Sequence, residues 1–212
     1  MFNFSENPVT LILLTVNVLV SLYALYGDQS LVGRLSFRPR EILEHRQYHR
    51  LLTAGFVHVG LAHLLFNMMT LFFFGPVIEQ TLGSGKFLLL YFGAELAAHG
   101  FSLYMHHNNP SYAAVGASGA VSGVVFSFCL FAPYEMLFVF FIPMPAIVFA
   151  VVYVAGSIYA MKSAQGQGMT GGIAHEAHIG GAVAGLLLTI LLEPRIIGHF
   201  LQEIRRYEQI FG

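Results

Sequence analysis

Long apolar stretches separated by short polar segments dominate the chain. A helix needs about 20 mostly apolar residues to cross the hydrocarbon core of a membrane. Six stretches come close to that length: Val9–Tyr26, Leu61–Ile78, Phe87–Met105, Val115–Ala132, Met136–Met161 and Ile173–Leu192. Their aliphatic residues are spread too evenly for the alternating pattern of a membrane β-barrel. The pattern therefore predicts an all-α, polytopic membrane protein with six transmembrane helices.

Two segments differ from these spans. Residues 27–57 carry five arginines interleaved with leucine, isoleucine and phenylalanine, which predicts a long loop lying at the membrane interface. Residues 195–212 place apolar side chains at helical spacing, with Arg205 and Arg206 on another side. This favours an amphipathic C-terminal tail, although a simple solubilising tail stays an equal alternative. We therefore expect one membrane domain over residues 1–194 and a tail over 195–212.

The composition agrees with a membrane protein and excludes several other classes. Of 212 residues, 56% are hydrophobic and 10% charged, whereas a soluble domain carries about 25% charged residues. The single cysteine, Cys129, excludes a disulfide framework and a CxxC metal site. A net charge of −1 offers no electrostatic case for nucleic acid. The N-terminus lacks the basic start of a cleaved signal peptide, so we expect the first span to remain as an anchor.

Polar residues are costly inside spans, so their positions carry information. If the six helices cross back and forth, the second, fourth and sixth begin on the same side of the membrane. The polar residues near those three beginnings are His58, His63, Asn67, Ser118, His175 and His178. The sequence therefore predicts a polar pocket that opens to one face of the membrane.

Glycine pairs lie beside two of these polar residues. Gly119 and Gly123 follow Ser118, and Gly181 and Gly185 follow His178. Small residues four apart let two membrane helices approach closely. Such an approach would bring Ser118 and His178 together, although the glycines would also serve packing alone.

Ser118 is the candidate nucleophile. It lies between Gly116-Ala117 and Gly119, whose missing side chains would permit a sharp entry into the helix and leave room for a substrate. A serine at a helix start also serves as an N-cap, and that role stays open. The soluble hydrolase elbow G-x-S-x-G is not matched, because Ala120 replaces its last glycine.

Serine needs a neighbouring base to take its proton, and His178 is the best candidate. Glu176 points about 160° away from His178 around a helix that turns about 100° per residue. We therefore expect a Ser118–His178 dyad without a carboxylate. A histidine at a helix end also commonly has a structural role.

Acyl transfer further requires hydrogen-bond donors for the oxyanion. His63 and Asn67 are four residues apart and share one helical face. With the backbone N–H of Ser118 they would form an oxyanion hole. Alternatively, His63 and Asn67 bond each other or a loop carbonyl.

At these residues the sequence resembles the rhomboid family of intramembrane serine proteases. The resemblance rests on His58-x4-His63-x3-Asn67, on Gly116-Ala117-Ser118-Gly119, and on Ala177-His178 followed by Gly181 and Gly185, and it extends from Arg50 to Leu192. It implies a six-helix core, Ser118 as nucleophile and His178 as general base. It also implies an oxyanion hole of His63, Asn67 and the Ser118 amide, with Gly116 and Gly119 keeping the site open.

The same resemblance implies where and on what the protein acts. Substrates would be transmembrane segments of other proteins in the lipid bilayer, cleaved without a cofactor or a metal. The protein would cross the cell (inner) membrane several times, with both termini in the cytoplasm and the active site facing the outer side. Counting the arginines of the first loop against Lys86 and the C-terminal arginines predicts the reverse orientation. A structured interfacial loop is poorly suited to this rule, so we follow the family.

Two further positions depart from the family pattern. Many members carry a tyrosine four residues after the nucleophile, where its ring stacks on the catalytic histidine, but this chain has Ser122. The family's frequent Trp-Arg pair in the first loop is His49-Arg50 here. The first departure leaves the orientation of His178 without an explanation from sequence.

Other classes of function remain as alternatives. Glu95 and His99 lie one turn apart inside the third span, as in a proton-coupled transporter, or they form a packing hydrogen bond. A metal or haem protein would draw on the ten histidines, but no carboxylate or thiol completes a familiar ligand set. An inactive relative that binds transmembrane helices typically lacks the serine or histidine, and this chain has both. The sequence does not indicate an oligomeric state.

Overall fold

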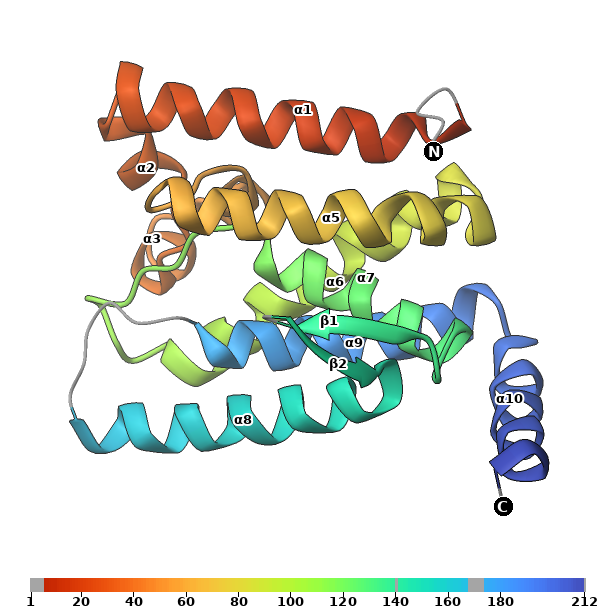
Figure 1. The fold of residues 1–212 in the computed structure, drawn as a ribbon. Helices are drawn as coiled ribbons and strands as arrows, with labels where there is room; N and C mark the ends of the chain where they lie inside the picture. The colour runs from red at the N-terminus through yellow and green to blue at the C-terminus, as the bar shows by residue number, and fades with distance from the viewer. Residues whose placement is uncertain (1–5, 140, 168–173, 212) are drawn as a thin grey trace.

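The structure, a computed structural model, describes residues 6–139, 141–167 and 174–211. Its described residues are mostly helical (Figure 1). The long apolar helices are α1 (Pro8–Leu22, continued by the π-helical turn η2, Tyr23–Gly27), α5 (Leu61–Leu82), α6 (Ser84–His106), α7 (Ser118–Phe131), α8 (Ala146–Gln167) and α9 (His175–Leu192). They form one bundle in which α6, α7 and α9 pack most extensively against each other.

The helices alternate in direction along the bundle. In Figure 1, α5, α7 and α9 all begin at the end of the bundle where the first loop lies. The start of α1 and the C-terminal helix α10 (Ile196–Phe211) lie at the opposite end. The three helices that carry the polar candidates therefore start on the same side, as the sequence predicted.

Among the described residues, four helices are long and apolar enough to cross a membrane: α1 with η2, α5, α6 and α9. The chain is a multi-pass membrane protein on this measure, and α7 and α8 are further apolar helices. Helix α7 has 14 residues, which at 1.5 Å per residue gives about 21 Å against a hydrocarbon core of about 30 Å. Its two ends cannot both reach the membrane surfaces.

The predicted helix over Met136–Met161 is wrong in its first part. Residues Met136–Val139 (β1) and Ile142–Pro145 (β2) form an antiparallel hairpin, and α8 begins only at Ala146. Pro143 and Pro145 explain this, because proline lacks the N–H that a helix interior requires. Both prolines lie on β2, in a hairpin of two strands where a missing N–H costs little.

The first loop is folded around a buried arginine. It contains α2 (Ser30–Leu35), α3 (Pro39–Leu43), α4 (Arg50–Thr53) and the 3₁₀ turn η3 (Ala54–Phe56). The Arg50 guanidinium donates hydrogen bonds to the carbonyl oxygens of Gly33 at 3.0 Å and Ser36 at 2.7 Å. These bonds hold α4 to α2 and to the residue that follows it, within the loop itself.

Helix α10 lies against the other end of α7. The His199 ring bonds the Phe131 carbonyl oxygen at 2.7 Å, and the rings of Tyr134 and Tyr207 stack with centroids 4.0 Å apart. The tail of the chain is thus a helix attached to the bundle.

The backbones of α7 and α9 approach each other closely. A Cβ atom on Gly181 would lie 2.0 Å from the carbonyl oxygen of Gly119, and one on Gly185 would lie 2.3 Å from that of Gly123. Neither position has room for a methyl group. The two glycine pairs therefore set the distance between α7 and α9, as their sequence spacing predicted.

We expect Gly181→Ala to lower the thermal stability of the purified protein in detergent. The methyl group must push α9 away from α7, and such overpacking typically costs about 1–3 kcal/mol. Thermal unfolding measures the loss. Gly156→Ala on α8 is the matched control, because a Cβ there meets no atom within 4 Å. Equal melting temperatures for the two variants would contradict the close contact.

Candidate active site

Ser118 is the first residue of α7 and is partly exposed. The preceding turn depends on Gly116, whose φ of +109° lies in a region that favours glycine. The Gly116 N–H donates to the Ala54 carbonyl oxygen at 2.9 Å, which ties this turn to the first loop. A Cβ on Gly116 would lie 2.4 Å from Cε1 of His63, so the absent side chain makes room for that ring.

His178 lies in the first turn of α9, beside the start of α7. A Cβ on Gly119 would lie 3.8 Å from the Ala177 carbonyl oxygen, and one on Gly181 would lie 3.0 Å from the Cα of Gly119. Backbone atoms adjacent to Ser118 and to His178 are therefore in contact range. No hydrogen bond joins the two side chains in the described structure, which is common for catalytic pairs before substrate binds.

The ring that faces His178 comes from α8. The Tyr153 ring lies nearly parallel to that of His178, with centroids 6.2 Å apart and an interplanar angle of 22°. The Tyr153 hydroxyl shares a 2.7 Å hydrogen bond with the hydroxyl of Ser122. Ser122 stands where the family resemblance led us to expect a tyrosine, and the ring beside His178 comes from α8 instead.

His63 and Asn67 lie on α5 beside the Gly116 turn. The Asn67 side-chain amide donates to the His63 carbonyl oxygen at 2.9 Å, which uses one of its two N–H groups. The Nδ1 atom of His63 is buried and has no hydrogen-bond partner among the residues that the structure describes. His178 lies within electrostatic range of His63. The structure thus places His63 near Ser118 and His178. The bond from Asn67 to the His63 carbonyl oxygen agrees in part with the alternative that these two residues bond each other.

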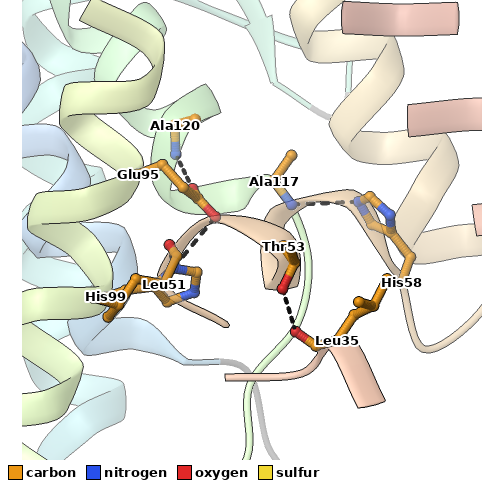
Figure 2. A network of polar contacts seen from close by, with 8 residues as sticks. All are labelled: Leu35, Leu51, Thr53, His58, Glu95, His99, Ala117 and Ala120. Carbon is orange, nitrogen blue, oxygen red and sulfur yellow. Dashed lines mark hydrogen bonds and ion pairs between the residues drawn. The ribbon is translucent and has the colours of Figure 1, made fainter. Parts of the chain in front are cut away.

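His58 connects α1 to the residue before Ser118. Its Nδ1 lies 2.8 Å from the Ser21 hydroxyl, and its Nε2 accepts the Ala117 N–H at 3.4 Å (Figure 2). The Ser21 hydroxyl itself donates to the Phe56 carbonyl oxygen, which leaves it as an acceptor for His58. Burial, with a smaller contribution from His63, lowers the pKa of His58 to about 3. His58 is therefore neutral, with its proton on Nδ1.

Glu176 turns away from His178, as its position on the helix predicted. It accepts hydrogen bonds from the hydroxyls of Tyr112 and Ser102 and lies 3.4 Å from Nε2 of His106. Burial and the neighbouring carboxylate raise the pKa of Tyr112. Within the described residues, no carboxylate bonds the His178 ring.

Glu95 and His99 form a contact inside the bundle. Nδ1 of His99 lies 3.5 Å from Oε1 of Glu95, and both side chains are almost fully buried. Glu95 also accepts the N–H of Ala120 on α7, and His99 bonds the Leu51 carbonyl oxygen (Figure 2). These contacts bind α6 to its neighbours, which favours the packing interpretation of the pair. Among the described residues, no three histidine, cysteine or acidic side chains converge as metal ligands.

Comparisons with known proteins agree with this architecture. A sequence model of the Rhomboid domain matches residues 45–195. Rhomboid protease GlpG of Serratia proteamaculans is 30% identical over 191 residues, which cover 85% of this chain and 61% of the relative. Putative rhomboid protease YdcA of Bacillus subtilis is 39% identical over 79 residues, which cover 37% of this chain and 38% of the relative. RHOMBOID-like protein 12, mitochondrial, of Arabidopsis thaliana is 30% identical over 156 residues, covering 66% of this chain and 45% of the relative.

The fold and these residues thus define a polytopic membrane protein. It carries a partly buried serine and several histidines at one end of its helices. The chain belongs to the rhomboid family, because the family's domain covers most of its length. It spans less than two thirds of the length of each of these relatives.

Two residues of this region were not predicted as neighbours of the site. Tyr153 was not identified, because a tyrosine in an apolar helix does not indicate which helix it faces. Glu95 is unusual in the sequence, but its contact with the start of α7 was not predicted. A buried acid in a membrane helix was the only available signal.

We expect His58 to make stability depend on pH below about 6.5. The folded protein holds His58 neutral down to pH about 3, whereas the unfolded chain protonates it near pH 6.5. The contribution of neutral His58 to the free energy of unfolding is therefore complete above pH 6.5. It decreases as the pH falls, by about 2 kcal/mol at pH 5. Melting temperatures at pH 7.5 and pH 5 should differ less in His58→Gln than in the unsubstituted protein. The same difference in both would contradict a neutral, buried His58.

Proposed function

We propose that this chain is an intramembrane serine endopeptidase that hydrolyses peptide bonds in or near transmembrane segments of other membrane proteins. The observation that carries the proposal is the contact between α7 and α9. Gly119, one residue after Ser118, lies against Gly181, three residues after His178, with no side chain between the two backbones. Membership of a family whose named relatives include proteases supports the same activity.

Ser118 is the nucleophile and His178 the general base in this proposal. The Ser118 oxygen bonds to the carbonyl carbon of the scissile peptide, and its proton passes to His178. His178 then gives this proton to the departing amine, leaving an ester on Ser118. Water, deprotonated by His178, hydrolyses the ester and restores the serine. A dyad suffices for these steps, in keeping with the orientation of Glu176 towards Tyr112.

The negative oxygen of the tetrahedral intermediate requires donors nearby. The backbone N–H of Ser118 has no acceptor in the described structure and lies at a helix N-terminus, where the helix dipole favours negative charge. His63 and the second N–H of Asn67 complete the proposed oxyanion hole. Gly116 and Gly119 leave the peptide free to approach.

The remaining assignments follow from the same proposal. Residues 1–194 form the protease domain, with residues 27–57 at the membrane interface, and residues 195–212 form the amphipathic tail. We place the protein in the cell (inner) membrane with cytoplasmic termini and the active site towards the outer side. The lipid bilayer and transmembrane substrates are its partners.

A fluorophosphonate probe should label the purified protein at Ser118. Ser118→Ala should abolish labelling and the cleavage of a transmembrane peptide in proteoliposomes. His178→Ala should lower both by at least about 10³-fold, because serine loses its base. Ser30→Ala and His107→Ala, outside the bundle core, are the matched controls and should retain both activities. Cleavage that survives Ser118→Ala would contradict the proposal, and binding without labelling or cleavage would indicate an inactive binder of transmembrane helices.

We expect Tyr153→Leu to lower kcat about 3- to 10-fold with little change in KM. The ring facing His178 is lost, and ring stacking is typically worth about 0.5–1.5 kcal/mol. Tyr153→Phe and Ser122→Ala keep the ring but lose the hydroxyl pair, so they should cause smaller reductions. Tyr159→Leu on the exposed side of α8 is the control. An unchanged kcat in Tyr153→Leu would show that the ring does not orient His178.

A further inference from the structure

Helix α7 begins without a cap of its own. Ala117 occupies the N-cap position, and its side chain offers no hydrogen-bond acceptor. The first N–H groups of any helix have no partner within the helix. Here two of the nearby N–H groups are satisfied from other elements: His58 accepts that of Ala117, and Oε2 of Glu95 accepts that of Ala120 at 2.9 Å (Figure 2).

Glu95 is enclosed by the elements that it joins. It lies on α6 with 2% of its surface exposed. A Cβ on Gly119 would lie 3.0 Å from its Oε2, and a Cβ on Gly55 would lie 2.5 Å from its Oε1. Two glycines, one on α7 and one in the first loop, thus make room for this carboxyl group.

His99, one turn after Glu95, attaches the same part of α6 to the first loop. Its Nδ1 lies 2.8 Å from the Leu51 carbonyl oxygen, and its ring stacks on Phe37 with centroids 4.9 Å apart. Phe37 pairs through backbone hydrogen bonds with Ala114, just before the turn that leads into α7. The first loop, α6 and the start of α7 are therefore held as one unit.

We infer that Glu95 is a positioning residue for Ser118, acting as an N-cap that a neighbouring helix supplies to α7. Its carboxyl group holds the N–H of Ala120. Within the described residues, the N–H groups of Ser118 and Gly119 are left without an acceptor. The first turn of α7 is thereby fixed while its two foremost donors stay free to bind a substrate oxygen. The inference rests on the proposed protease function.

Glu79 provides a matched comparison. It is also a buried glutamate that caps another helix, since it accepts the N–H groups of Val9 and Thr10 at the start of α1. It lies at the other end of α5 from His63 and Asn67. Loss of Glu79 should therefore lower stability without changing the turnover of the molecules that remain folded.

The test measures kcat and KM for a transmembrane peptide, together with thermal stability, in Glu95→Ala, Glu95→Gln, Glu95→Asp and Glu79→Ala. Misplacing a reacting group by ~1 Å can cost about 10²-fold, so we expect Glu95→Ala to lower kcat at least about 10-fold. KM should change less than about 2-fold, because substrate binding elsewhere is untouched. Glutamine reaches Ala120 with a neutral oxygen and should retain most of the kcat. Aspartate keeps the carboxyl group but is one methylene shorter, so it should behave like alanine.

Three results would overturn the inference. One is an unchanged kcat in Glu95→Ala and in Glu95→Asp. Another is an equal reduction of kcat per folded molecule in Glu79→Ala, since the effect would then be general destabilisation. The third is unchanged backbone amide exchange at residues 119–121 in all three Glu95 variants, which would exclude the cap. We expect this exchange to accelerate in Glu95→Ala and in Glu95→Asp but not in Glu95→Gln.

The exchange measurement separates this inference from the proposed function. If the unsubstituted protein neither cleaves the peptide nor reacts with the serine probe, the protease proposal fails. Amide exchange still decides whether Glu95 caps α7, because it does not depend on activity. If Glu95→Ala does not fold, the contrast between Glu95→Gln and Glu95→Asp decides the question in the same way.

Discussion

The backbone contact between α7 and α9 is the constraint on which the rest of the structure depends. Inside a membrane, helices are not driven together by exclusion of water, so close packing must supply the attraction. Gly119, Gly123, Gly181 and Gly185 remove the side chains where the first halves of the two helices meet. The start of α7 and the start of α9 are therefore adjacent because of backbone shape, before any polar group contributes.

Polar groups at the centre of such a bundle are stabilised when they find partners there. Each backbone N–H or C=O group left without a hydrogen bond in hydrocarbon costs several kcal/mol. Helices α1 and α7 both start without a side-chain cap of their own, and they receive acceptors from Glu79 and Glu95. Buried acids in this chain thus complete helix ends. This explains why Glu95 and His99 occur inside a span without requiring a transport pathway.

The aromatic neighbour of His178 comes from a helix that the sequence did not indicate. Ser122 is too short to place a ring on His178 from α7. Its hydroxyl instead bonds the hydroxyl of Tyr153, and the Tyr153 ring approaches His178 from α8. The site therefore has an aromatic neighbour for the histidine although the expected position in the sequence lacks one.

The sequence by itself determined the membrane class, the approximate spans, and the side on which Ser118, His63 and His178 begin their helices. These follow from hydrophobic length and from the cost of polar residues in lipid, which are local properties of the chain. Only the tertiary structure decided that Tyr153 faces His178 and that Glu95 reaches Ala120. Each of these depends on which helix lies beside which, and at what rotation. The apolar composition of the helices does not indicate which helix lies beside which or how each is rotated, because lipid-facing and helix-facing positions use the same residues.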